Sequence, residues 1–432
     1  MTARTETSMR HVVALVSVLL AAIPASAADL TGDWEFALKI LNDSSYTRGT
    51  WKTDGEKVSG NVGENKIEGT TRGDEVTFRV TRPNGTSGGE FKGKLTGSEL
   101  KGTATIPGIG EASWTGRREP KRPDKPQVHA FEPTEFHRVF SDAIPPVLRI
   151  FPGDTVKTWT VDAGGVDSKG VRRSQGGNPE TGPFYVEGAL PGDTLVVKLT
   201  TVRLNRDSAI SSGRIASSAL TPAYVERTKY QDNFDSDWVL DRVNGVARLK
   251  NPSAHLKNYS VRLQPMLGCI AVAPPAHQSF RTGYPGTFGG NMDYNQMREG
   301  TTLYLPVFAP GALLFVGDGH AAQGDGELTG NALETSMDVE FTVDLIRSQA
   351  TGAPRAENDE FLMSSGIGNS LTDALQLATT QLANWLQRDY KLEPNEAAVV
   401  LGTAMRYDIA EVVDPLVHVV AKIRKDAVAQ LK

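Results

Sequence analysis

A buried strand that runs into a polar loop decides how this chain folds: residues 312–327 read ALLFVGDGHAAQGDGE. The first five residues are apolar, so we expect a strand that lies inside the protein. The remainder consists of Gly, Ala and side chains that bind metals or form hydrogen bonds. Asp318, His320, Asp325 and Glu327 fall within ten positions. The four glycines of the stretch let the backbone turn tightly enough to bring these side chains together.

This loop has the composition of a metal site. Carboxylate oxygens together with one imidazole nitrogen are a ligand set that divalent metals accept. The spacing is not that of a standard zinc signature such as His-Glu-x-x-His. The same composition is also typical of an exposed hairpin turn, where Asp and Gly are common for conformational reasons. Taken alone, residues 318–327 therefore leave a metal site and a plain turn as open alternatives.

Several motifs in a fixed order extend the pattern over much of the chain. They are PGDTV at 152–156 leading to Asp162, NPETGPFYVEGA at 178–189 with PGD at 191–193, GCIAVAP at 268–274, GGNMD at 289–293, and the 316–327 stretch. With these motifs, roughly residues 133–425 closely resemble the acetamidase/formamidase family of amidohydrolases. The resemblance implies a β-rich, amide-hydrolysing domain. It also implies that the 318–327 loop and the region of Asp162 and Asn178 border the active site.

The composition is that of an ordinary globular protein, since 39% of the 432 residues are hydrophobic and 22% are charged. The formal net charge of −5 gives no reason to expect a nucleic-acid partner. The chain contains 43 glycines and 24 prolines, which predicts many turns and hence a strand-rich fold. We therefore expect a mainly β protein with a C-terminal α+β part.

The first 27 residues have the pattern of a secretory signal peptide. Arg4 and Arg10 supply a positive region, residues 12–23 an apolar core, and residues 25–27 a small-residue cleavage site. The apolar run is short for a transmembrane helix, and an uncleaved membrane anchor is the alternative. We expect the mature chain to begin near Ala28 in a periplasm or outside the cell, without membrane contact after cleavage.

Residues 28–118 read as a small all-β domain, because short strands alternate with turn signals such as Asn84-Gly85. A meander of such hairpins forms a small barrel or a sandwich. The tryptophans Trp34, Trp51 and Trp114 either line a ligand groove or pack in the core.

Residues 119–132 read as a linker, since three prolines and alternating charges within eight residues argue against packed structure. Residues 133–432 follow as the β-rich domain that resembles the family. Inside it, the segment 204–260 reads as an insertion or a mobile segment without recognisable chemistry. From residue 371 to residue 385 the apolar residues recur at helical spacing behind an N-cap at Ser370, which predicts an amphipathic helix.

Nucleophilic catalysis finds little support in the sequence. The single cysteine, Cys269, lies in an apolar run, and cysteines in such runs are usually buried and inert. A Gly-x-Ser-x-Gly elbow between strand and helix is absent from the sequence. Metal-assisted hydrolysis of an amide is therefore the coherent interpretation.

The resemblance and the local composition together assign the metal ligands. Asp318 and His320 are the expected ligands, with Asp162 from the opposing loop as a weaker third. Zinc is the metal that we expect, and calcium is the alternative.

Proton transfer is assigned to Glu327 or Asp325, which would take a proton from the attacking water and pass it to the departing ammonia. His320 is counted with them among the catalytic residues. Three polar residues are expected to hold the amide: Asn291, Gln323 and Asn178. Glu334 ranks lower, because a continuous strand would place it on the opposite face from Glu327.

The sequence thus predicts a secreted hydrolase that cleaves the carbon–nitrogen bond of a short carboxamide such as formamide or acetamide with metal-activated water. The expected partners are a small amide and, as a possible assembly, a second copy in a homodimer. The rival hypothesis is a secreted protein that binds a carbohydrate or wall polymer and carries an inactive amidase-like domain.

Overall fold

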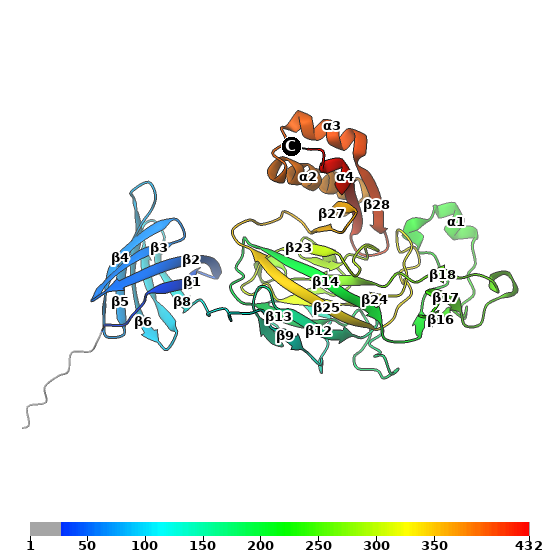
Figure 1. Cartoon of the computed structure of the whole chain (residues 1–432), viewed down its shortest axis with the longest axis horizontal. Coiled ribbons are helices and arrows are strands. Elements are labelled where there is room, and N and C mark those ends of the chain that lie inside the picture. The colour runs from blue at the N-terminus through cyan, green and yellow to red at the C-terminus, as the bar shows by residue number, and fades with distance from the viewer. Residues whose placement is uncertain (1–26, 432) are drawn as a thin grey trace, which may run out of the picture. The chain divides into compact units, whose positions relative to one another are not determined.

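The computed structural model describes residues 27–431, so nearly all of the predicted signal peptide lies outside the described residues. The chain divides into two compact units, one ending at Arg118 and the other beginning at Glu119 (Figure 1). In the part of the chain that is described, no helix has the length and apolar character needed to cross a membrane.

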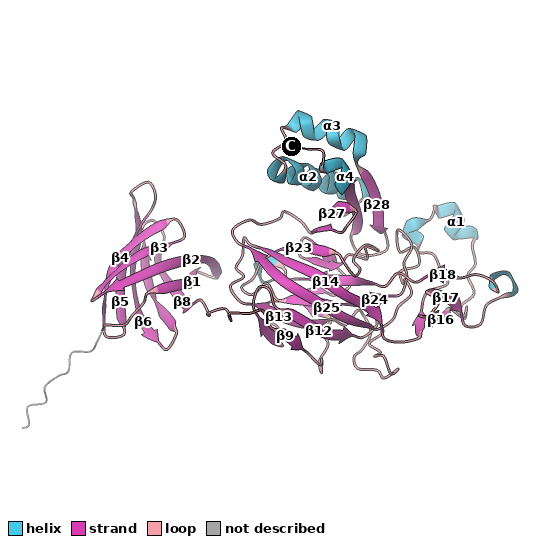
Figure 2. Ribbon diagram, viewed as in Figure 1, coloured by secondary structure: helices cyan, strands magenta, loops and turns pink. Residues whose placement is uncertain are grey.

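The first unit is a closed barrel of eight antiparallel strands in sequence order, and β8 pairs with β1 (Figure 2). Its strands are β1 (Gly32–Ile40), β2 (Asp43–Asp54), β3 (Lys57–Val62), β4 (Asn65–Arg72), β5 (Glu75–Thr81), β6 (Ser87–Thr96), β7 (Glu99–Ile106) and β8 (Gly110–Arg118). Strand β5 shows why the unit folds this way, since Val76, Phe78 and Val80 are buried and alternate with exposed polar residues. Closure leaves no sheet edge unpaired.

The tryptophans of the barrel were expected either to line a ligand groove or to pack in the core. Trp34 and Trp51 are buried and belong to the hydrophobic core of the unit. Trp114 belongs to the same core and also lines a cavity at one end of the barrel.

The second unit contains two large sheets. The six-stranded sheet has the order β11 (Leu148–Ile150), β13 (Thr181–Val186), β24 (Leu314–His320), β19 (Met266–Ala271), β22 (Gly289–Asn291), β21 (Pro285–Gly286). The nine-stranded sheet has the order β28 (Arg406–Glu411), β29 (Val417–Arg424), β27 (Phe361–Gly368), β26 (Arg355–Glu357), β23 (Thr302–Pro306), β14 (Thr194–Leu204), β25 (Met337–Ile346), β12 (Thr155–Thr160), β9 (Val128–Ala130). A two-stranded sheet pairs β10 (Val139–Phe140) with β20 (Phe280–Arg281).

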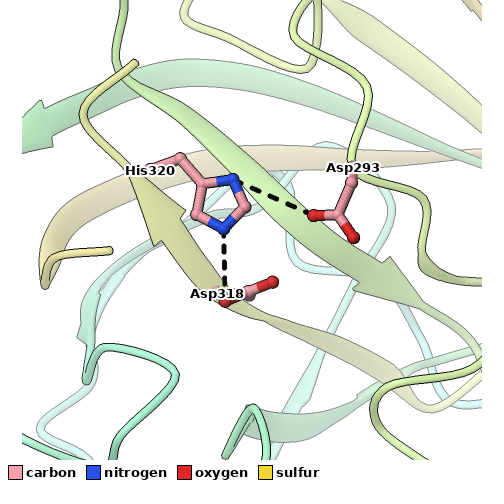
Figure 3. Close-up of side chains that lie close together, drawn as sticks. All are labelled: Asp293, Asp318 and His320. Carbon is pink, nitrogen blue, oxygen red and sulfur yellow. Dashed lines mark ion pairs between the residues drawn. The ribbon is translucent and has the colours of Figure 1, made fainter. Parts of the chain in front are cut away.

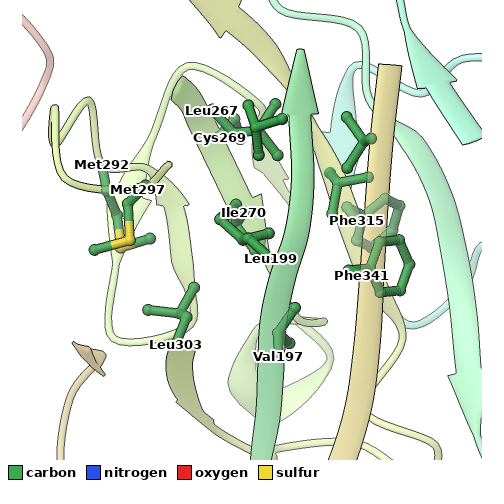
Figure 4. Packing of buried hydrophobic residues seen from close by; sticks show 14 of the residues in the cluster. Val197, Leu199, Leu267, Cys269, Ile270, Met292, Met297, Leu303, Phe315 and Phe341 are labelled. Atoms are coloured by element: carbon green, nitrogen blue, oxygen red, sulfur yellow. The ribbon is translucent and has the colours of Figure 1, made fainter. Parts of the chain in front are cut away.

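The main core lies between these two sheets. Side chains of β14 and β25 in one sheet meet side chains of β19 and β24 in the other (Figure 4). Phe315 and Phe341 are fully buried there. Strand β24 is buried along its whole length, which confirms that a buried strand leads into the polar stretch. It begins at Leu314 and continues through His320, so Asp318 and His320 lie on the strand and not in the expected loop. This packing fixes the end of β24, where the polar loop begins.

The segment 204–260, which the sequence suggested to be an insertion or a mobile segment, contains regular secondary structure. It contains most of a four-stranded sheet: β15 (Ser208–Ile210), β16 (Asp237–Asp241), β17 (Val246–Leu249) and β18 (Val261–Arg262). Trp238 and Leu240 of β16 are buried and join the main core, so the segment is anchored to the rest of the unit. The alternation of apolar and polar residues is short here and is interrupted by polar turns, so these strands could not be recognised from the sequence.

The C-terminal part is α+β, as expected. Its helices are α2 (Leu371–Asp389), α3 (Pro394–Ala404) and α4 (Lys425–Val428), and α1 (Pro222–Arg227) lies earlier in the chain. Three short 3-10 helices span Ser217–Ala219, Ala254–Leu256 and Pro275–His277. Ser370 caps α2, since its side chain accepts a hydrogen bond from the N–H of Asp373 at 3.1 Å. Leu382 and Trp385 of α2 pack on β27 and β29.

One part of the predicted linker 119–132 is structured. Val128–Ala130 forms strand β9, which pairs in parallel with β12. The carboxylate of Asp154 accepts a hydrogen bond from the N–H of Gln127 at 2.7 Å. The last proline of the linker is Pro126, so the backbone N–H groups that follow it can donate hydrogen bonds to a sheet.

Candidate active site

The candidate site lies at one end of the six-stranded sheet. Asp318 and His320 end β24, while Glu180 directly precedes β13 on one side. On the other side Gly268 lies near the start of β19, and Asn291 ends β22. These neighbouring strands are antiparallel, so the C-terminal end of one meets the N-terminal end of the next. The topology therefore gathers residues separated by more than a hundred positions.

His320 is buried among carboxylates. Its Nε2 lies 3.3 Å from Oε2 of Glu334 and 3.4 Å from Oδ1 of Asp318, and its Nδ1 lies 3.9 Å from Oδ1 of Asp293. Figure 3 shows Asp318 and Asp293 on either side of the ring. Glu327 belongs to the same group, because its ligand atom lies within 4.8 Å of those of His320 and Glu334.

The arrangement fits a metal ion. Four buried atoms of the group lack a hydrogen bond of normal geometry: Nε2 of His320, Oδ1 of Asp318, Oδ1 of Asp293 and Oε2 of Glu334. Leaving such groups unsatisfied inside a protein is costly. Donor atoms around one tetrahedral ion lie roughly 3.3–3.6 Å apart, since each is about 2.0–2.2 Å from the ion. The separations around Nε2 of His320 are of this size.

Gly268 leaves room at the same place. A Cβ at this position would lie 2.3 Å from Oδ1 of Asp293, 2.7 Å from Oδ2 of Asp318 and 3.0 Å from Cε1 of His320. Any side chain would therefore occupy the space toward which the two carboxylates and the imidazole converge. The residues present can bind a divalent metal.

Glu334 belongs to the group, contrary to its low rank in the sequence analysis. The seven-residue spacing would place Glu334 opposite Glu327 only if one continuous strand joined them. Instead, a turn at residues 325–330 reverses the chain, and Glu334 pairs with His320 in an antiparallel bridge. The N–H of Thr335 donates to the carbonyl of Gly319 at 2.8 Å. Spacing within one strand therefore had no bearing on which face Glu334 occupies.

Gln323 holds the imidazole. Its Oε1 lies 2.9 Å from Nδ1 of His320, and its amide nitrogen donates to the carbonyls of Asp293 and Ala410. A hydrogen bond from Nδ1–H to Gln323 leaves the Nε2 lone pair directed at Asp318 and Glu334. Both polar atoms of the amide are thus engaged by the protein, which suits a residue that positions His320 better than one that holds substrate.

Asn178 and Asn291 form a bridge across the site. The amide nitrogen of Asn178 donates to Oδ1 of Asn291 at 2.8 Å and to Oδ2 of Asp318 at 3.1 Å. The amide nitrogen of Asn291 donates to Asp293 at 2.6 Å and to Asp414 at 2.7 Å. These two of the three predicted substrate residues therefore reach the site, where they orient its carboxylates.

Glu180 is a buried carboxylate that the sequence analysis did not assign. A Cβ on Gly317 would lie 2.4 Å from its Oε2, so the glycine makes space for the acid. Burial raises the pKa of Glu180, and the nearby Asp318 carboxylate raises it further. The thiol of Cys269 is also buried, and burial raises its pKa well above the usual value. A high thiol pKa speaks against Cys269 as a nucleophile.

The electrostatics of the group follow from packing several acids around one imidazole. Burial raises the pKa of Asp293, Glu327 and Glu334, and repulsion from neighbouring carboxylates acts in the same direction. Burial alone would lower the pKa of His320, but Glu334 and Asp318 more than offset this and raise it. Binding of a cation would relieve the repulsion among the carboxylates.

Several site residues have a left-handed backbone. The φ angles are 51° at Asn178, 42° at Asp293, 53° at Asp318 and 45° at Glu327. Such angles are uncommon for residues other than glycine, although Asn and Asp adopt them more readily than most. Clusters of this kind occur where a structure must aim side chains at a functional site.

Glu327 and Asp325, the two predicted bases, occupy different environments. Glu327 is buried and also lines a pocket of about 560 Å³ beside the cluster. Asp325 lines the same pocket but is exposed and lies outside the buried group, and its carboxylate accepts a hydrogen bond from Asn295 at 2.8 Å. The pocket therefore connects with the cluster through Glu327.

Asp162 is not part of the cluster, which corrects its prediction as a third ligand. Its Oδ2 accepts a hydrogen bond from Nη2 of Arg206 at 2.7 Å, and its Oδ1 accepts one from the N–H of Val166 at 2.9 Å. Arg206 lies in the segment whose structure was not predicted. Asp293 and Glu334 supply the further carboxylates instead.

This part of the chain is similar to known proteins. The acetamidase/formamidase family model matches residues 271–414, which include Asn291, Asp293 and the 318–327 loop. A Schizosaccharomyces pombe protein that is named as a formamidase is 28% identical over 254 residues. That alignment covers 46% of this chain and 61% of the yeast protein.

Solved structures extend the match. An acetamidase from Yersinia enterocolitica is 30% identical, with a TM-score of 0.59, over 71% of this chain and 94% of that chain. A recombinant acetamidase/formamidase from Thermoanaerobacter tengcongensis is 25% identical, with a TM-score of 0.60, over 71% of this chain and 99% of that chain. On the strength of these matches and of the residues gathered around His320, the chain belongs to the acetamidase/formamidase family.

Proposed function

We propose that this protein hydrolyses the carbon–nitrogen bond of a short linear carboxamide, such as formamide or acetamide, to a carboxylate and ammonia. The observation that carries the proposal is the group of buried donor atoms around His320, which opens through Glu327 into a pocket. Family membership supports the same reaction class.

His320, Asp318, Glu334 and Asp293 would hold the metal. The imidazole in this donor set favours zinc over calcium, because calcium in proteins takes oxygen ligands. A divalent cation bound there supplies Lewis acidity, which polarises an amide carbonyl and makes a nearby water easier to deprotonate.

Glu327 is our candidate for proton transfer, because it alone among these cluster residues also lines the pocket. Its carboxylate would accept a proton as the water oxygen bonds to the amide carbon. It would then return that proton to the nitrogen as the carbon–nitrogen bond breaks. Burial raises the pKa of Glu327, which brings a carboxylate closer to the pH at which a general base works best.

The pocket also bears on substrate size. Its walls include Trp238, Tyr259, Val261, Leu328 and Leu333. A volume of about 560 Å³ lies within the range of roughly 300–1,000 Å³ that pockets for drug-sized ligands occupy. Larger apolar amides therefore belong among the test substrates, together with formamide and acetamide.

The test pairs metal content with ammonia release from formamide, acetamide, a small lactam and phenylacetamide. His320→Ala should lose most of its metal, because it removes the one nitrogen ligand of the proposed donor set. Folded wild-type protein that stays active without metal and in the presence of chelators would defeat metal activation. Folded protein without turnover on any of these amides, under any added metal, would favour the rival binding function.

A matched pair of variants tests the base. Glu327→Gln should keep its metal but release ammonia roughly 10²–10⁴-fold more slowly. Asp325→Asn changes an exposed carboxylate two residues away and should leave the rate nearly unchanged. If Asp325→Asn is the slow variant, the assignment of the proton to Glu327 is wrong.

A further inference from the structure

We propose that the N-terminal barrel binds a small, largely apolar molecule that contains a ring, in a cavity at one end of the barrel. The cavity measures about 520 Å³, within the range of roughly 300–1,000 Å³ that ligand pockets occupy. Eight-stranded barrels are just wide enough either to be filled by side chains or to hold one small ligand. Here both situations occur, at opposite ends.

One end of the barrel is filled. Trp34 and Trp51 are buried with their rings 6.1 Å apart. The chain before β1 covers them, since Leu30 is buried and its carbonyl accepts a hydrogen bond from the indole of Trp34 at 2.9 Å. The guanidinium of Arg118 lies 4.6 Å from the Trp34 ring. A ligand therefore has no access from this side.

The other end is lined by rings that lie against the wall. Phe78 and Phe91 stack with centroids 4.8 Å apart, and Trp114 meets Phe78 edge-on at 5.3 Å. The indole N–H of Trp114 donates to the carbonyls of Lys92 and Thr103 at 3.1 Å, which holds the ring at the wall. Aromatic walls of this kind favour a ring-bearing ligand.

Phe91 shows that the interior is open here. Phe91 is paired directly with Phe78 and with Ala104, which are both buried. Directly paired residues lie on the same face of a sheet, so Phe91 also points inward. It is nonetheless only half-buried. Its exposed surface faces the cavity, where no protein side chain covers it.

The mouth is polar. It is formed by turns between strands and lined by Tyr46, Glu64, Asn65 and Arg82. An apolar body inside and a polar group at the mouth therefore define the class of ligand that fits. This proposal does not depend on the amidase function of the second unit.

The test uses the whole protein and the neutral dye N-phenyl-1-naphthylamine, whose fluorescence rises in apolar surroundings. Thr47 is paired with the buried Phe36 and lines the cavity, so Thr47→Phe should fill it. Lys52 on the same strand is exposed and follows the inward-facing Trp51, so Lys52→Phe is the matched outward control. Ser45→Phe blocks the same cavity nearer the mouth, in case Thr47→Phe does not fold.

We expect saturable binding of one dye molecule per chain, with energy transfer from tryptophan that decreases in Trp114→Phe. Affinity should fall at least tenfold in Thr47→Phe or Ser45→Phe and stay unchanged in Lys52→Phe. Ammonia release should not change when dye occupies the barrel. Absence of saturable binding, or equal binding by the folded cavity-filling variants, overturns the proposal. Equal binding would place the dye elsewhere, such as the pocket beside Glu327.

Discussion

Gly268→Ala tests the cation site without changing any ligand. Gly268 has no left-handed backbone angle, so alanine can adopt its conformation. The added Cβ would stand 2.3 Å from Oδ1 of Asp293 and 2.7 Å from Oδ2 of Asp318. To reach an ordinary contact of 3.4 Å, the two oxygens must retreat by about 1.1 Å and about 0.7 Å. Metal–ligand distances tolerate roughly 0.2 Å, so both oxygens would leave binding distance.

We expect the metal affinity of Gly268→Ala to fall by at least about 10–100-fold. This is the loss seen when a residue that hydrogen-bonds to a metal ligand is removed. Amide turnover should fall with it. Gly324→Ala is the control, since a Cβ there meets nothing within 4 Å and the residue lies in the loop beside the site. Metal content is measured after dialysis against graded chelator, with circular dichroism to check folding. Should folded Gly268→Ala retain metal as tightly as the wild type, the cation does not lie among these atoms.

Two further predictions concern other parts of the chain. If the chain is exported and its signal peptide removed, mass spectrometry of the mature protein should find a start near Ala28. Soluble protein that retains Met1 would contradict this prediction. Burial lowers the pKa of His418 to about 4, whereas the ordinary value in the unfolded chain is about 6.5. As the pH falls from 6.5 toward 4, protons therefore bind preferentially to the unfolded state. Stability should decrease over that range by about 3 kcal/mol through this residue. Urea unfolding at pH 7 and pH 4.5 should therefore show a steeper acid loss in wild type than in His418→Gln, and identical losses would rule this out.

The sequence allowed the centre of the site to be predicted because its chemistry is local. Asp318, His320 and Glu327 fall within ten positions, at the end of β24 and in the loop that follows it, and the Gly-rich composition indicated that they could converge. The predicted helix after Ser370 held for the same reason, since the cap and the apolar spacing are properties of neighbouring residues. Such features are readable without knowledge of the tertiary structure.

The remaining site residues depend on which segments become neighbours. Glu334 reaches His320 only because the chain reverses after Glu327, and Asp414 arrives from a loop near the C-terminus. Asp162 lies outside the group, and its carboxylate is bound instead by Arg206, 44 residues away. Glu180 and Asp293 both belong to the motifs at 178–189 and 289–293, and an acid within two residues of a buried strand was the signal that could have identified them.

The left-handed backbone of Asp293, Asp318 and Glu327 has a consequence for how the protein can change over generations. Each non-glycine residue in that conformation costs on the order of 1 kcal/mol, and glycine would remove the cost. Mutation to glycine at these positions would remove this backbone cost while deleting a proposed metal ligand or the candidate base. A screen for thermal tolerance alone should enrich such inactive variants, so stabilising this protein by directed evolution requires selection on turnover in the same round.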